Sequence, residues 1–97
     1  MTTHLERMLL EARDGDTAAL GQMLELHRRY LTLLARLQIY QRLQGKADPA
    51  DLVQETFLEA HRNFGKFRGT TQGEFVCWLR QIFERNGGQD YIRPQRL

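Results

Sequence analysis

Residues 48–69 read DPADLVQETFLEAHRNFGKFRG, and this stretch contains a complete helix with the signals for both of its ends. Asp48 is a typical N-cap, because its carboxylate can accept a hydrogen bond from an N–H group of the first turn. Pro49 suits the first helical position, where its missing N–H costs nothing. Gly65 should end the helix. We therefore predict a helix from Asp48 to about residue 64, followed by an aromatic and basic turn at residues 64–69.

The spacing of the side chains gives this helix two faces. The apolar face, which should be core, consists of Val53, Thr56, Phe57, Ala60 and Phe64. The other face carries Asp51, Glu55, Leu58 and Arg62, with Gln54 and Glu59 beside them. Like charges four residues apart repel by a few tenths of a kcal/mol. The acids therefore either only keep the surface soluble or suit a basic, partly apolar partner.

Capping signals predict three further helices. The capping residues are Thr3, Asp16 and Thr71. Gly15 should end the first helix in the left-handed conformation. The second helix is expected to be one long helix to about Leu43, and the last should run from about residue 72 to residue 86. No stretch alternates like a strand, so we expect an all-α domain, a compact bundle of three main helices plus an N-terminal helix.

Composition excludes several classes of protein. The chain has 97 residues, which is one domain, and a net charge of +2. Residues 1–61 hold seven Lys/Arg against nine Asp/Glu, and residues 62–97 hold seven against three. The basic last third indicates a polyanionic partner. Without a long apolar run or a signal-peptide pattern, we expect no membrane segment and a cytoplasmic location.

Signatures of catalysis and metal binding are absent from the sequence. There is no phosphate-binding glycine loop and no histidine at metal-ligand spacing, so we predict no enzyme, no metal and no cofactor. His27 interrupts an apolar face and is expected to be a satisfied core or boundary residue. Cys77, the single cysteine, is expected to be a buried and inert thiol.

Aromatic and basic residues are interleaved in the turn and the last helix. The rings are Phe64, Phe67, Trp78 and Tyr91, and the cations are Lys66, Arg68, Arg80, Arg85, Arg93 and Arg96. Cations neutralise phosphates and rings hold unstacked bases. Core packing is the main role expected of the rings, whereas a polyanion is the leading use of the arginines.

Three motifs together resemble region 2 of bacterial extracytoplasmic-function (ECF) sigma factors. They are DLVQETFL at residues 51–58, FRG at 67–69 and FVCWLRQI at 75–82, followed by Asn86 and Asp90. Their order and spacing are specific, and the resemblance extends from about residue 12 to residue 96. It implies a transcription initiation domain of the sigma region 2 type over residues 1–97. It also implies a longer protein, whose C-terminal domain for the −35 element is absent from this sequence.

The resemblance assigns two surfaces. The helix at 48–64 would dock on the β′ clamp helices of core RNA polymerase, through Asp51, Gln54, Glu55, Leu58 and Glu59. The turn and last helix would recognise the −10 element, help to melt it and capture a base of the non-template strand. The base-reading loop would contain Lys66, Phe67, Arg68, Gly69 and Thr70. The DNA-facing helix or its support would contain Trp78, Arg80, Gln81, Arg85 and Asn86. An anti-sigma factor is a further partner implied by this family.

The alternative is a helical protein-interaction module, such as an adaptor or an anti-sigma target, without direct DNA contact. It predicts that Arg68, Arg80 and Arg85 do not converge on one face, and that Phe64 and Phe67 are fully buried. The sequence leaves open the promoter recognised, the regulating signal and the oligomeric state.

Overall fold

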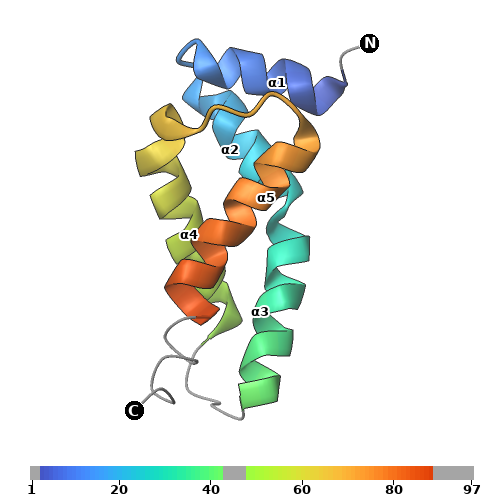
Figure 1. The fold of residues 1–97 in the computed structure, drawn as a ribbon, viewed down its shortest axis with the longest axis vertical. Helices are drawn as coiled ribbons and strands as arrows, with labels where there is room; N and C mark the ends of the chain where they lie inside the picture. The colour runs from blue at the N-terminus through green and yellow to red at the C-terminus, as the bar shows by residue number, and fades with distance from the viewer. Residues whose placement is uncertain (1–2, 43–47, 89–97) are drawn as a thin grey trace.

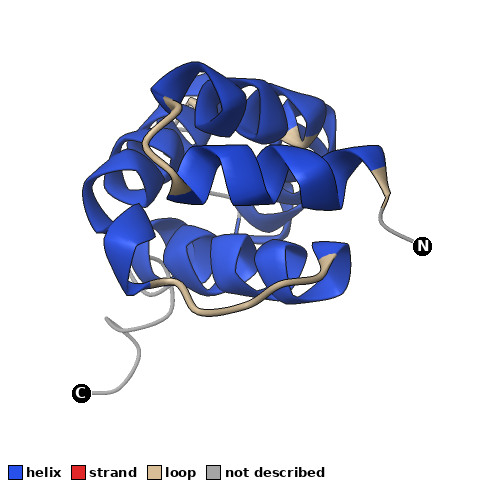
Figure 2. Cartoon of the chain, turned by 90° about the horizontal axis from the view of Figure 1, so that it is seen from above, coloured by secondary structure: helices blue, strands red, loops and turns tan. Residues whose placement is uncertain are grey.

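The computed structural model describes residues 3–42 and 48–88, and every regular element in these ranges is helical (Figures 1 and 2). The elements are α1 (His4–Arg13), α2 (Thr17–Leu26), α3 (Arg28–Arg42), α4 (Pro49–Asn63), the 3₁₀ turn η1 (Phe64–Lys66), α5 (Gln72–Phe83) and the π-helical turn η2 (Glu84–Gly88). The predicted all-α class is confirmed. The expectations for Leu43, for the loop at 44–47 and for residues 89–97 lie outside the described residues.

The predicted caps are confirmed. Thr3 and Thr71 each form a complete capping box, the first with Glu6 and the second with Glu74. Asp48 accepts a hydrogen bond from the N–H of Ala50 at 3.0 Å, ahead of Pro49 at the start of α4. At the end of α1, Gly15 has a φ of 105°, a left-handed conformation that side chains other than glycine rarely adopt.

The prediction of one long second helix is wrong, because the helix divides at His27. The N–H of His27 donates to the carbonyl of Leu24 at 3.0 Å. The imidazole Nδ1 instead donates to the carbonyl of Met23, at 2.8 Å, which a backbone N–H would take in a continuous helix. This local competition by a side chain ends α2, and α3 begins at Arg28. His27 itself is buried and satisfied, as predicted.

Helices that follow one another along the chain pack against each other around a single core. Figure 1 shows α1 across one end of the molecule, α3 and α4 along its length, and α5 crossing between them. Contacts join α1 to α2, α3 to α4, and α4 to α5. The predicted inner face is confirmed, because its four residues in α4 and Phe64 in η1 are all buried. The largest fully buried side chains are Leu9, Met23, Leu24, Leu31, Val53, Thr56, Phe75, Leu79, Ile82 and Phe83.

Cys77 is exposed, so the prediction of a buried thiol is wrong. The core stripe of α5 includes Phe75 and Leu79, which are fully buried. Cys77 is two residues from each of them, about 200° around the helix axis. It therefore lies on the opposite side of α5 from the core.

Candidate functional site

An aromatic cluster connects η1, the segment after it and α5. The ring of Phe67 lies 5.0 Å from that of Trp78 and 5.9 Å from that of Phe75, measured between centroids. Phe64 lies 6.1 Å from Trp78. Phe64 and Phe67 are buried, whereas Trp78 is half-buried. The cluster therefore extends the core outward to the surface at Trp78.

Loop 67–71, which joins η1 to α5, is held by α1 at its first half. Nη2 of Arg13 donates to the carbonyl of Phe67 at 3.0 Å and to the carbonyl of Gly69 at 2.6 Å. The Arg13 guanidinium also lies over the Phe67 ring, 5.4 Å from its centroid. Sequence reasoning missed Arg13, because 54 residues separate it from Phe67 and no local pattern connects them.

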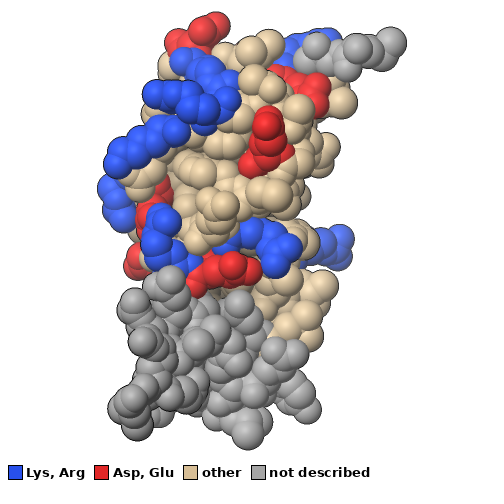
Figure 3. Space-filling model, in the orientation of Figure 1, with Lys and Arg blue, Asp and Glu red and all other residues tan. Residues whose placement is uncertain are grey.

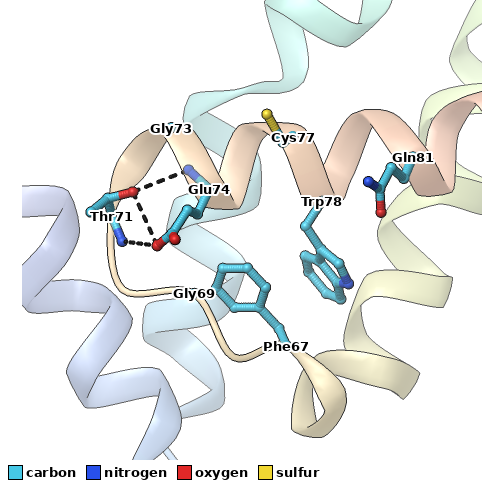
Figure 4. Close-up of a pocket in the computed structure, with 8 residues that line it drawn as sticks. All are labelled: Phe67, Gly69, Thr71, Gly73, Glu74, Cys77, Trp78 and Gln81. Atoms are coloured by element: carbon cyan, nitrogen blue, oxygen red, sulfur yellow. Dashed lines mark hydrogen bonds between the residues drawn. The ribbon is translucent and has the colours of Figure 1, made fainter.

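The second half of the loop is held by Glu74. One oxygen of this carboxylate accepts a hydrogen bond from the backbone N–H of Thr70 at 2.7 Å. It also accepts one from the backbone N–H of Thr71 at 3.1 Å (Figure 4). The N–H of Thr70, and then that of Thr71, lower the pKa of Glu74 below its usual range. A charged Glu74 therefore orders the loop at neutral pH.

In this structure, the side chain of Arg68 bonds to a backbone carbonyl a few residues before it in the chain. Its Nη1 donates to the carbonyl of Gly65 at 2.6 Å. The guanidinium of this predicted DNA contact thereby links the loop to η1.

Gly69 lets the loop backbone lie close to the Phe67 ring and to Glu74, which a residue with a Cβ could not do. A Cβ placed on Gly69 would lie 2.5 Å from the Phe67 ring and 2.7 Å from the Cβ of Glu74. Both distances are far below van der Waals contact. The glycine of the FRG motif therefore has a packing role at the base of loop 67–71.

An open hollow of about 570 Å³ lies between the loop and α5 (Figure 4). We call it the Trp78 hollow, and its lining residues are Phe67, Gly69, Thr71, Gly73, Glu74, Cys77, Trp78 and Gln81. Four of the ten predicted DNA-binding residues line it, namely Phe67, Gly69, Trp78 and Gln81. Aromatic rings, polar groups and an exposed thiol thus meet in one solvent-accessible depression.

A second, more polar hollow of about 330 Å³ adjoins the first. Its lining includes Trp78 and Gln81, which belong to both hollows, together with the predicted residues Lys66, Arg85 and Glu59. Figure 3 shows Lys and Arg side chains gathered along the edge that carries η1 and the end of α4. Arg62 in the last turn of α4 and Lys66 in η1 supply cations there.

The predicted polymerase contacts divide into two groups. Asp51, Gln54 and Glu55 are exposed on α4, and Leu58 is 43% exposed among them. Glu59 is partly buried and turns toward η2, where Arg85 donates to its carboxylate and Asn86 donates at 3.1 Å. Because of the bond from Arg85 above all, the pKa of Glu59 is lowered, although burial opposes this effect.

The remaining predicted DNA contacts are dispersed. Arg80 pairs with Glu84 at 3.2 Å, and the nearby Tyr30 of α3 and Glu84 raise its pKa. Arg80 is thus paired with Glu84 of η2, whereas Arg85 is paired with Glu59 of α4. Phe64 is 9% exposed and Phe67 is 6% exposed, so neither ring is fully buried, contrary to the prediction of the interaction-module alternative.

In residues 3–42 and 48–88, no three His, Cys, Asp or Glu side chains are grouped so that they could hold a metal ion. None of the helices described in these ranges combines the length and the apolar character that crossing a membrane requires.

Two comparisons with known proteins find similarity to the same family. The family model for sigma-70 region 2 matches residues 25–96. The ECF RNA polymerase sigma factor BldN of Streptomyces coelicolor is 35% identical over 97 residues, which cover 99% of this chain and 34% of that relative. The chain thus spans about a third of the length of this curated relative. No solved structure matches the chain significantly.

Proposed function

The chain belongs to the sigma-70 region 2 family of transcription initiation factors, and we propose how its two surfaces are used. The outer face of α4 binds the β′ clamp helices of core RNA polymerase. Loop 67–71 and α5 recognise the −10 promoter element and help to melt it by capturing a base of the non-template strand. The observation that carries the proposal is the Trp78 hollow, which is open and partly aromatic and adjoins a second hollow lined in part by Lys66 and Arg85. Such a role places the chain in the cytoplasm.

The polymerase surface is a patch of acids around an exposed apolar side chain. Asp51 and Glu55 supply negative charge, Gln54 supplies hydrogen-bonding groups and Leu58 supplies apolar area. This combination complements a basic and partly apolar surface. Glu59 has a different task, because its carboxylate is already bonded to Arg85 and Asn86. An anti-sigma factor that covered the same acids would compete with polymerase.

The DNA surface needs both a place for a base and charges for the backbone. Unstacked bases pack on aromatic rings and are read through hydrogen bonds to their edges. In the Trp78 hollow, Trp78 offers the ring and Gln81 offers a side-chain amide, whereas the hydroxyl of Thr71 is already bonded to Glu74. Lys66, in the adjoining hollow, is available to a phosphate of the same strand.

A charge reversal tests the polymerase surface. We expect Glu55→Lys to weaken retention of core RNA polymerase and binding to a β′ coiled-coil fragment. The matched control is Glu11→Lys, the same change at an exposed acid of α1, which should retain polymerase like the wild type. Unchanged affinity of the Glu55 variant would remove this half of the proposal.

Strand binding tests the other half. In the presence of core polymerase, the chain should bind single-stranded DNA of a −10 element, with an affinity that falls steeply as salt is added. Absence of binding at low salt would favour the second candidate, the interaction module, with which core packing of Phe64 and Phe67 is consistent. That module would bind a protein partner but no DNA.

A further inference from the structure

We propose that Arg13 is a positioning residue for base recognition, so that α1 is part of the unit that reads the promoter. The inference rests on the proposed function of loop 67–71 and names a residue that controls it. Helix α1 lies outside residues 25–96, which the family model matches. The contribution of Arg13 would therefore come from outside the region that the family model matches.

Arg13 holds loop 67–71 at two backbone carbonyls, and we call this pair of contacts the Arg13 clamp. One nitrogen of Arg13, Nη2, donates to two carbonyls that are two residues apart in the loop, those of Phe67 and Gly69. Two carbonyls can meet one donor only if the backbone between them turns, so these bonds select one conformation of the peptide units from 67 to 69. Hydrogen bonds from a charged donor are shorter and stronger than neutral ones.

The clamped residues are also those that form the Trp78 hollow. Phe67 and Gly69 both line it, and Phe67 packs on Trp78 at 5.0 Å between ring centroids. The guanidinium lies over the Phe67 ring, so Arg13 holds this residue by its backbone and its ring together. Loss of Arg13 would release one wall of the hollow, and it would also loosen the N–H groups of Thr70 and Thr71, because the N–H of Thr70 belongs to the same peptide unit as the carbonyl of Gly69.

Helix α1 presents Arg13 in a fixed place. Leu9 and Ala12, in the last turn of α1, are buried against the rest of the core. Arg13 is the last residue of the helix, and Gly15 turns the chain away immediately afterwards. Figure 1 shows the loop passing beside α1 at this end of the molecule. The anchor is therefore a well-packed helix end, not a mobile side chain on a solvent-exposed helix.

Arginine suits this role better than lysine. Its guanidinium is planar, carries several N–H donors and stacks on rings, whereas an ammonium is a compact and strongly hydrated charge. Arg13→Lys should retain the charge but lose the simultaneous contact with Phe67 and Gly69. The Arg13→Lys variant therefore distinguishes the effect of the Arg13 contacts on the loop from simple electrostatic attraction between α1 and DNA.

The test compares Arg13→Ala, Arg13→Lys and Arg7→Ala in the full 97-residue chain. Arg7 is an exposed arginine on the same helix, so its loss changes the charge equally. The first measurement is hydrogen exchange of the amides of Thr70 and Thr71 without DNA. The second, with core polymerase present, is the affinity for single strands of a −10 element that differ at one base.

In Arg13→Ala, we expect exchange of these amides to accelerate about tenfold and discrimination between bases to fall by a similar factor. Arg13→Lys should lie between wild type and Arg13→Ala in both measurements. Arg7→Ala should match the wild type in exchange and discrimination, with at most a small uniform loss of affinity. Thermal unfolding of each variant shows whether the fold is retained, and the lysine variant keeps the test decisive if the alanine variant does not fold.

Two results would overturn the role of Arg13 alone: unchanged discrimination in Arg13→Ala and Arg13→Lys, or equal losses in Arg13→Ala and Arg7→Ala. If the wild type bound no strand at all, the proposed function would be wrong, and base recognition by Arg13 would be wrong with it. The wild-type strands thus distinguish the failure of the function from the failure of the clamp.

Discussion

Arg85 of η2 donates to the carboxylate of Glu59 on α4, so a residue predicted to bind DNA neutralises one predicted to bind polymerase. The side chain of Glu59 is 17% exposed and that of Arg85 is 54% exposed. Asn86 adds a second bond to the same carboxylate. The pair therefore fastens the end of α5 and η2 to α4, between the two proposed surfaces.

Removal of this link should destabilise the fold modestly. We expect Glu59→Gln and Arg85→Gln each to lower the free energy of unfolding by about 0.5–1 kcal/mol, because partly exposed ion pairs contribute little. In the double variant, the losses should be less than additive by roughly 0.5 kcal/mol, since the variants remove the same contact. Urea denaturation of the four proteins measures this coupling. Fully additive losses would mean that the ion pair contributes nothing to stability.

Gly69 should not tolerate a methyl group. In Gly69→Ala, the new Cβ would lie 2.5 Å from the Phe67 ring, and we expect the free energy of unfolding to fall by about 1–3 kcal/mol, as in overpacked cores. Gly73→Ala is the matched control, because its Cβ would have no neighbour within 4 Å. That helical substitution should be neutral or stabilise by up to about 1 kcal/mol. Equal stability of the two variants would contradict the close approach at Gly69.

Order in loop 67–71 should depend on pH through Glu74. Its folded-state pKa is depressed by the N–H groups of Thr70 and Thr71. The stabilisation is therefore fully present above the usual carboxyl pKa of 4.5 and is lost as the pH falls through the lower folded-state value. The amide resonances of Thr70 and Thr71 should shift together in this acidic range, and in Glu74→Gln they should not. A shift centred above 4.5 would contradict the sign of the effect.

Local signals predicted local structure well. The start and inner face of α4 follow from Asp48, Pro49 and the apolar spacing, because capping and amphipathicity act within one helix. The break at His27 was missed because it depends on an imidazole that takes the carbonyl of Met23 in place of a backbone N–H. No spacing of apolar residues encodes that choice.

Long-range side-chain contacts could not be predicted in the same way. The partners of Arg13 are 54 and 56 residues away, and Arg85 is 26 residues from Glu59. Arg13 meets its partners only because α1 lies beside loop 67–71. Arg85 meets Glu59 only because α5 and η2 pack on α4. The error at Cys77 is different, because its position relative to Phe75 and Leu79 already indicated the outer face. There the general tendency of cysteine to be buried was given more weight than the helical period.

Cys77 provides a direct test of the Trp78 hollow. It is the single cysteine of the chain, it is exposed, and it lines the hollow. We expect iodoacetamide to label it in the folded chain, and we expect a bound −10 strand to slow the labelling in proportion to the fraction bound. Mass spectrometry of the peptide that contains Cys77 measures this even with core polymerase present.

The informative control for Cys77 labelling is a strand with the same phosphates but one missing base, placed at each position in turn. When the missing base is the one that the hollow holds, the strand should still be attracted by Lys66 and its neighbours. At saturation it should nevertheless leave Cys77 open to iodoacetamide, because nothing covers the Trp78 ring. Equal protection by every abasic strand would show that phosphate contacts alone shield the thiol, and the hollow would then not be the base pocket.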